Sequence, residues 1–423
     1  MWYYILRVFI GFYGKVYFKK IYFSGLTKLP TDRPLILACN HPTAFIDPML
    51  VGGITLKAKN FLLRGDMFGK GKLVESFLKS IKCIPIYRFQ DGFASMKKNE
   101  ASLEYCYDLL GKGENVFILA EGVAKHEKRM RPIQKGTARL AFGAYEKHKR
   151  KDIVVVPIGI NYTDSLAFRS NIYADFGAPI PLSDFFDDHS QNPRKAIKKL
   201  TDRLSKEMRQ RIIHIADEAD DKLGNQLLEV EVNKQKEKAF PRLSYQLSRQ
   251  SLMWEKIERL NALSEEQKNT LRNKATAYFE QLNKLGVTDL GVAQKSYASI
   301  WMLLALIIGL PAFLYGIIGN ILPIKIGKYI AEKKANTLAF NSSLRFAFEM
   351  LAYMFYFGLL FILSLFLGSN WMILAVLLLP LFGHFSLQWL DHFKLWRAGQ
   401  KAKRLAKADL ASLEKLRLPL AEF

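Results

Sequence analysis

A histidine and an aspartate six residues apart follow a short apolar run near the start of the sequence. Residues 40–48 read Asn-His-Pro-Thr-Ala-Phe-Ile-Asp-Pro, with His41 and Asp47 as the ionisable side chains. An imidazole can take a proton from an attacking hydroxyl near neutral pH, and a neighbouring carboxylate can fix its tautomer and stabilise its cation. The pair predicts general-base chemistry, although a structural histidine fits the same spacing.

Two more polar positions follow apolar runs. Arg88 comes directly after Cys-Ile-Pro-Ile-Tyr at 83–87, where a guanidinium suits a phosphate, although a surface ion pair is the plainer reading. Glu121 and Gly122 follow the run at 115–120, and Glu121 can either hold a substrate hydroxyl or anchor its own loop. A basic stretch follows, with Lys125, Arg129, Arg131 and Lys135.

Alternating strands and helices must position these side chains. Apolar and β-branched runs predict buried strands at 34–39, 83–87, 115–120, 153–160 and 171–176. Helical patterns lie between them at 43–56, 69–80, 93–111 and 134–149. The predicted fold class is therefore α/β, a sandwich of a mixed sheet covered by helices. We expect Pro42 to stand at the first position of the first of these helices and Pro157 to shape the wall of the site.

The composition indicates anionic partners. With 62 Lys and Arg against 39 Asp and Glu, the formal net charge is +23, which favours phosphates, coenzyme A, acyl carrier protein and acidic lipid surfaces. No aromatic-plus-basic recognition block supports nucleic acid as a partner. Cys39, Cys83 and Cys106 have neither disulfide nor metal-ligand spacing, so we expect reduced thiols, no metal site and a cytoplasmic catalytic part.

The C-terminal part is predicted to be a membrane region. Three apolar segments approach the roughly 20 residues that cross a bilayer: 299–323, 346–367 and 371–390. Basic residues gather at 324–345 and after Asp391, so both stretches are expected on the cytoplasmic side. The first segment then has both flanks on one side. Because it contains Pro311 and three glycines, we expect a re-entrant or broken hairpin there.

Taken together, the blocks around His41, Arg88, Glu121 and Pro157 resemble the four motifs of the glycerolipid acyltransferase superfamily over about residues 25–182. The resemblance implies that His41 is the general base and that Asp47 orients it. It also implies that Arg88, Glu121 and Gly122 bind the acceptor, and that the block with Pro157 supports the acyl donor. Lys125 and Arg129 are expected to join the acceptor's phosphate site.

Two features place the resemblance more finely. Five residues separate His41 from Asp47, as in the yeast-type glycerol-3-phosphate acyltransferases, and the sequence Phe-Arg-Ser at 168–170 points the same way. Ala120 stands where many members have proline, which bears on the acceptor more than on the reaction. We expect an integral membrane O-acyltransferase of phospholipid biosynthesis with no cofactor. It would move a fatty acyl group from acyl-CoA or acyl carrier protein to glycerol 3-phosphate, lysophosphatidate or a related acceptor.

The main alternative is a catalytically silent lipid-binding or membrane-scaffolding protein on the same fold. The residues 1–24 are expected to form an interfacial helix, since aromatic residues alternate with lysines there, although a core-packing helix has the same periodicity. The predicted division of the chain is the helix at 1–24, an acyltransferase domain at 25–184, a helical connecting region at 185–296, a membrane region at 297–392 and a basic tail at 393–423.

Overall fold

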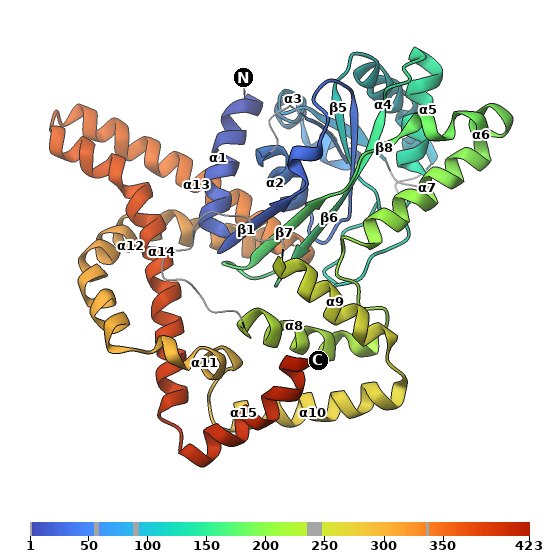
Figure 1. The fold of residues 1–423 in the computed structure, drawn as a ribbon. Helices are drawn as coiled ribbons and strands as arrows, with labels where there is room; N and C mark the ends of the chain where they lie inside the picture. The colour runs from blue at the N-terminus through green and yellow to red at the C-terminus, as the bar shows by residue number, and fades with distance from the viewer. Residues whose placement is uncertain (1, 55–58, 88–92, 235–247, 336–337) are drawn as a thin grey trace. The chain divides into compact units, whose positions relative to one another are not determined.

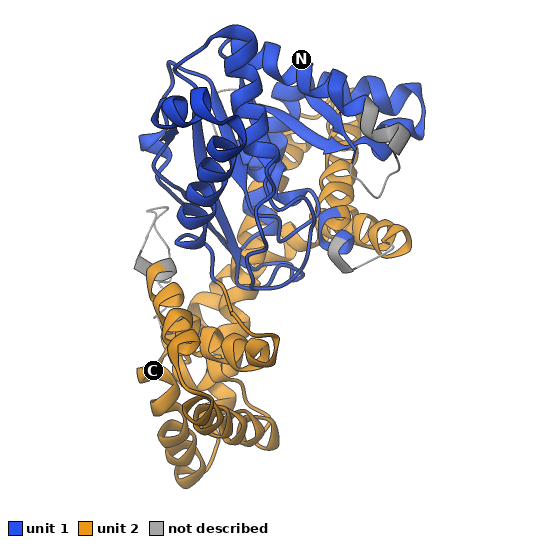
Figure 2. Ribbon diagram, turned by 90° about the vertical axis from the view of Figure 1, so that its right-hand side faces the viewer, with its two compact units in different colours: residues 1–213, 337–343 blue, residues 214–336, 344–423 orange. Residues whose placement is uncertain are grey.

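The computed structural model describes residues 2–54, 59–87, 93–234, 248–335 and 338–423. The chain forms two compact units (Figure 2). Unit 1 comprises residues 1–213 together with 337–343, and unit 2 comprises residues 214–336 and 344–423. The short segment 337–343 therefore belongs to the N-terminal unit although it lies far along the sequence.

Unit 1 is built on a mixed β-sheet of strand order β1-β7-β6-β2-β5-β3-β4, with β8 paired to β6 (Figure 1). Strands β6, β2, β5, β3 and β4 run parallel to one another, β7 and β8 are antiparallel to β6, and β1 is parallel to β7. The strands are β1 Lys20–Ser24, β2 Leu35–Cys39, β3 Lys59–Arg64, β4 Cys83–Ile86, β5 Asn115–Leu119, β6 Val154–Tyr162, β7 Asn171–Phe176 and β8 Ile180–Pro181.

Helices cover both faces of this sheet, because parallel neighbours need crossover connections. One face packs on α4 (Phe93–Gly111), α5 (Gly136–His148) and α7 (Pro193–Arg209), around Ile36 and Val155. Helices α1 (Trp2–Tyr17) and α2 (Ile46–Ile54) pack on each other on the other side (Figure 1). All five residues of the central strand β2 are buried, so the predicted α/β sandwich is confirmed. Two shorter helices complete the unit, α3 (Lys72–Ser80) and α6 (Phe186–Gln191).

Three local expectations differ from the structure. The N-terminal helix ends at Tyr17, and Lys20–Ser24 forms β1, because this segment pairs in register with β7 at the edge of the sheet. Strand β3 was not predicted, since its first residues, Lys59 and Asn60, are polar although both are buried. Helix α2 begins at Ile46, so Pro42 precedes it within a loop and does not occupy its first turn.

Unit 2 begins with a helical bundle. Its elements are α8 (Asp221–Lys234), α9 (Ser248–Ala262), α10 (Glu265–Lys284), α11 (Asp289–Ala293) and α15 (Lys407–Glu422). The buried Asp289 carboxylate accepts hydrogen bonds from Asn233 on α8, Tyr278 on α10 and Arg417 on α15. The C-terminal segment expected as a basic tail therefore contains a helix that packs into the connecting region.

The rest of unit 2 holds α12 (Ile300–Lys334), most of α13 (Leu338–Phe366) and α14 (Asn370–Lys403). By length and composition, these three helices are the candidates for crossing a membrane among the described residues. The break in the helix expected at 299–323 is wrong, because α12 is one helix of 35 residues with Pro311 inside it. Its glycines serve packing: a side chain at Gly316 would collide with the Phe382 carbonyl of α14.

Candidate active site

The site lies at the carboxyl ends of two adjacent parallel strands. Strand β2 ends at Cys39 and β5 ends at Leu119, and these two residues are paired in register. The residues that follow them, His41 and Glu121, therefore leave the sheet at the same edge. This is the edge at which open α/β sheets bind ligands.

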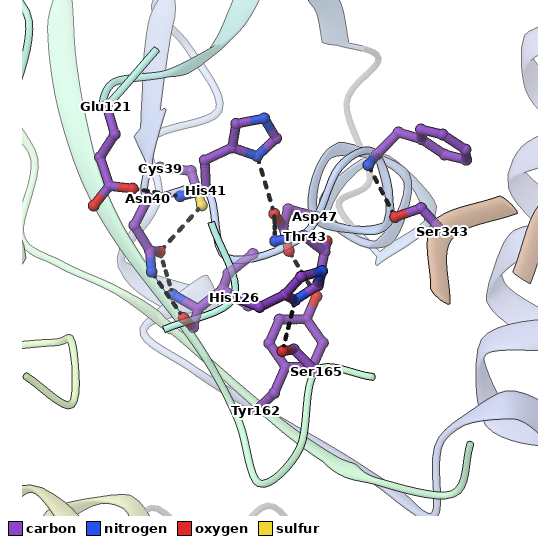
Figure 3. Close-up of polar contacts among 12 residues, drawn as sticks. Cys39, Asn40, His41, Thr43, Asp47, Glu121, His126, Tyr162, Ser165 and Ser343 are labelled. Atoms are coloured by element: carbon purple, nitrogen blue, oxygen red, sulfur yellow. Dashed lines mark hydrogen bonds and ion pairs between the residues drawn. The ribbon is translucent and has the colours of Figure 1, made fainter. Parts of the chain in front are cut away.

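A buried carboxylate holds the His41 ring. His41 Nδ1 lies 3.3 Å from Asp47 Oδ2, and Asp47 is fully buried in the first turn of α2 (Figure 3). The same Oδ2 accepts a hydrogen bond from Thr43 N at 3.0 Å. Residues 42–45 thus fold around the carboxylate as a loop, which explains why α2 starts later than the sequence predicts. With Nδ1 facing Asp47, Nε2 is the nitrogen left to act on a substrate.

Tyr162, at the end of β6, supplies a third contact that sequence reasoning missed. Its hydroxyl donates to Asp47 Oδ1 at 2.6 Å, and the tyrosine is only 5% exposed. Burial, followed by the neighbouring Asp47 charge, raises the pKa of Tyr162 well above its usual value, so the phenol remains a donor. Nothing in the local sequence signals this role, because Tyr162 and Asp47 are 115 positions apart.

Asn40 joins β2 to β6 beside the histidine. Its side-chain Oδ1 accepts from Ile160 N at 2.7 Å and its Nδ2 donates to Ile160 O at 2.9 Å. The expected wall residue, Pro157, lies earlier in β6, in register with Ala38, and its carbonyl accepts from Gly177 N. The later part of β6 therefore supplies the bonds to the site.

Glu121 connects the first and third motifs through their backbones. Its Oε2 accepts from His41 N at 3.1 Å and its Oε1 accepts from Arg131 N at 3.0 Å. Burial raises the pKa of Glu121 above its ordinary value, opposed by these two amide donors. The geometry favours the loop anchor over direct binding of a hydroxyl. Gly122 follows with φ of 75°, a left-handed conformation that suits glycine.

The basic stretch folds back over the histidine. Lys125 N donates to His41 O at 3.2 Å, which brings this loop to the site. Glu127 faces three of the cations, with Lys125 at 2.9 Å, Arg131 at 3.0 Å and Arg129 at 3.7 Å. Burial opposes ionisation of Glu127, but hydrogen bonds from Lys125 and Arg131 lower its pKa overall. The loop is thus held in place by Glu127 while it keeps a net positive charge.

A second histidine in this loop was also missed. His126 Nδ1 lies 2.9 Å from Ser165 Oγ, and its Nε2 is buried with no hydrogen-bond partner among the described residues (Figure 3). Ser165 stands in the loop after β6. The signal that could have found His126 is its position within five residues of Glu121.

The remaining expected positions are the second motif and the cysteines. Arg88 lies outside the described residues. Just before it, the Asn99 side chain on α4 bonds both the amide and the carbonyl of Tyr87, each at 2.7 Å. Burial raises the pKa of Cys83 and of Cys106 to about 12, and it raises that of Cys39 well above its usual value. These thiols are therefore poor nucleophiles.

The part of unit 1 that contains the carboxylate-held histidine is similar to known proteins. Residues 20–161 match the model of the Acyltransferase family. The match runs from β1 almost to the end of β6 and includes His41, Asp47 and Glu121.

Two curated relatives come from Saccharomyces cerevisiae. Glycerol-3-phosphate O-acyltransferase 1 is 31% identical over 103 residues, which cover 24% of this chain and 14% of the yeast protein. Glycerol-3-phosphate O-acyltransferase 2 is 26% identical over 114 residues, which cover 27% of this chain and 15% of that protein. The matched segments thus span only a small part of either yeast protein.

A solved structure, the 1-acyl-sn-glycerophosphate acyltransferase from Thermotoga maritima, matches with a TM-score of 0.35 and 16% identity. This match covers 48% of the present chain and 79% of that protein.

Proposed function

We propose that this chain is a membrane-bound O-acyltransferase. It would move a fatty acyl group from acyl-CoA or acyl carrier protein to a hydroxyl of glycerol 3-phosphate, lysophosphatidate or a related phosphate-bearing acceptor. The observation that carries the proposal is the His41–Asp47 contact of 3.3 Å inside a domain that matches the Acyltransferase family. The similarity to glycerol-3-phosphate acyltransferases supports the acceptor class.

The reaction proceeds by direct transfer between the two substrates. His41 Nε2 removes the proton of the acceptor hydroxyl, and the oxygen attacks the thioester carbonyl carbon. The carbon–sulfur bond breaks, and the leaving thiolate takes the proton from the imidazolium, which restores neutral His41. Asp47 stabilises that imidazolium, as the carboxylate of a catalytic triad does. No acyl-enzyme on cysteine is proposed, because burial raises the pKa of all three thiols and makes them poor nucleophiles.

The acceptor phosphate would bind at the loop that follows Gly122. Lys125 has a half-exposed side chain, and its backbone is bonded to His41, so a phosphate there lies close to the base. Arg129 adds a second cation, and the enclosed Nε2 of His126 is a further hydrogen-bonding group in the same loop. Glu127 limits how freely these cations move, which pre-orders the loop before substrate arrives.

The catalytic unit would face the cytoplasm. Basic residues fill the last turns of α12, and the chain then enters segment 337–343 of unit 1. The positive-inside rule assigns this end of α12 to the cytoplasmic side, and the segment of unit 1 that follows it is expected on the same side. An Ala335→Cys variant should therefore react with a membrane-impermeant thiol reagent from the cytoplasmic face alone, and reaction from the opposite face would reverse the assignment.

Thiol release from acyl-CoA and from acyl carrier protein, measured with purified full-length chain against a panel of acceptors, tests the function. His41→Ala should lower the rate by about 10²- to 10⁴-fold, the usual scale of general-base catalysis. His148→Ala is the matched control, because His148 pairs with Asp108 at 2.9 Å elsewhere in unit 1. Lipid binding by wild type without thiol release under any acceptor would favour the silent lipid-binding alternative.

A further inference from the structure

The first residues of α13 belong to unit 1, which also contains His41 and Asp47. Residues 337–343 are part of unit 1, whereas α13 continues beyond them as an apolar helix of unit 2. Ser343 is fully buried and Ser342 is 2% exposed. These serines lie outside the residues that match the Acyltransferase family, so the family comparison assigns them no role.

Ser343 hydrogen-bonds the loop that contains His41 and Asp47. Its Oγ accepts a hydrogen bond from Phe45 N at 3.2 Å, across 298 positions of sequence (Figure 3). Phe45 directly precedes α2, and an amide at a helix start has no partner within its own helix. Ser343 therefore satisfies the amide of the residue before α2, as the N3 side chain of a capping box does in other helices.

The loop from His41 to Asp47 is thus held at three amides by three different acceptors. His41 N donates to Glu121, Thr43 N to Asp47, and Phe45 N to Ser343. The first two contacts arise within the family domain. The third comes from the C-terminal part of the chain and lies two residues from Asp47.

A second contact places the same segment. The Tyr17 hydroxyl at the end of α1 donates to Ser342 O at 3.2 Å, and Tyr17 is 1% exposed. Tyr17 is itself fixed by the Phe-Arg-Ser sequence at 168–170. Arg169 N donates to Tyr17 O, Arg169 Nη1 donates to Val16 O and Phe18 O, and the Phe168 ring lies 5.3 Å from the Tyr17 ring. The rings of Phe45 and Phe340 lie 6.4 Å apart beside the serine contact.

We propose that Ser343 is a positioning residue for the reaction, which holds Phe45 and thereby the spacing between His41 and Asp47. The active site is complete only when the first turn of α13 is docked on the catalytic loop. The inference rests on the proposed function for its kinetic consequence. The His41–Asp47 contact of 3.3 Å leaves little room for the loop to shift before this hydrogen bond is lost.

The test measures both kinetics and local order in the full-length chain. Ser343→Ala should lower kcat for thiol release about 5- to 30-fold, the scale of one buried hydrogen bond, with KM for the acceptor nearly unchanged. Hydrogen exchange of the peptide covering 41–49 should become faster. Ser343→Thr keeps the hydroxyl and should restore both readouts, and Tyr17→Phe should change both in the same direction by less.

Ser364→Ala is the matched control, because among the described residues this buried serine of α13 bonds only the Phe361 carbonyl within its own helix. It should leave kcat and exchange at 41–49 unchanged. Unchanged exchange in Ser343→Ala would overturn the inference, and so would faster exchange with wild-type kcat. If wild type itself releases no thiol, the proposed function fails, while the exchange measurement still decides whether Ser343 orders the loop.

Discussion

Removing one oxygen atom from Tyr162 tests how much the reaction depends on the carboxylate behind the histidine. Tyr162→Phe keeps the ring in the core and deletes the hydroxyl that donates to Asp47 Oδ1 at 2.6 Å. Asp47 is fully buried, so water cannot replace the lost donor. The carboxylate then retains Thr43 N and His41 on its other oxygen.

The expected loss follows from the strength of that bond. A hydrogen bond to a charged group contributes about 1.5–3 kcal/mol, and each 1.4 kcal/mol corresponds to about tenfold in rate. If Asp47 must keep its orientation as the imidazolium forms, kcat should fall by about 10- to 150-fold. This is less than the loss expected for His41→Ala, because the base itself is still present.

The assay is thiol release at saturating acceptor, together with thermal unfolding of the same preparations. Tyr3→Phe is the matched control, since the buried Tyr3 hydroxyl accepts from Lys59 N at 3.2 Å and has no hydrogen bond to His41, Asp47 or Tyr162. Both variants should lower the melting temperature by a few degrees, but only Tyr162→Phe should lower kcat. A Tyr162→Phe enzyme with wild-type kcat and a lowered melting temperature would show that the hydroxyl serves the core alone.

Two further substitutions test the role of Glu121 as the loop anchor and the pH dependence of the stability of unit 1. Glu121→Gln places an amide NH₂ opposite either His41 N or Arg131 N, so one buried donor loses its acceptor at a cost of about 1–3 kcal/mol. Lower melting temperature and lower kcat are expected, and a variant equal to wild type in both would remove Glu121 as the anchor. Arg150 hydrogen-bonds Asp152 and lowers its pKa, so this pair adds stability above about pH 4 that is lost as pH falls through the lowered pKa. Asp152→Asn should therefore lower the melting temperature slightly at pH 7, by the equivalent of less than about 1 kcal/mol for a partly exposed pair, and the difference from wild type should vanish in acid. A difference that grows in acid would contradict this sign.

The strands and helices of unit 1 could be predicted because their signals are local. Apolar runs such as Leu35–Cys39 and Val154–Tyr162 are recognisable as buried strands without knowledge of their neighbours. Strand β1 could not be recognised in this way, since Lys20–Ser24 is a strand only by its pairing with β7. The continuity of α12 could not be predicted either. Its glycines indicate a break when the sequence is considered alone, but in the structure they allow α14 to approach closely.

The candidate site divides in the same way. The sequence by itself determined which residue types are available, a histidine six positions before an aspartate and a glutamate before a glycine, and where they stand relative to predicted strands. Only the tertiary structure decided that Tyr162 and Ser343 hold the loop at 41–47 and that Glu121 bonds two backbone amides. The Tyr162, Ser343 and Glu121–His41 contacts join residues that are 115, 298 and 80 positions apart. The Glu121–Arg131 contact spans the adjoining loop. Hydrogen bonds need their atoms within about 3.5 Å, and for residues so distant in sequence the packing of the sheet and its helices sets that separation.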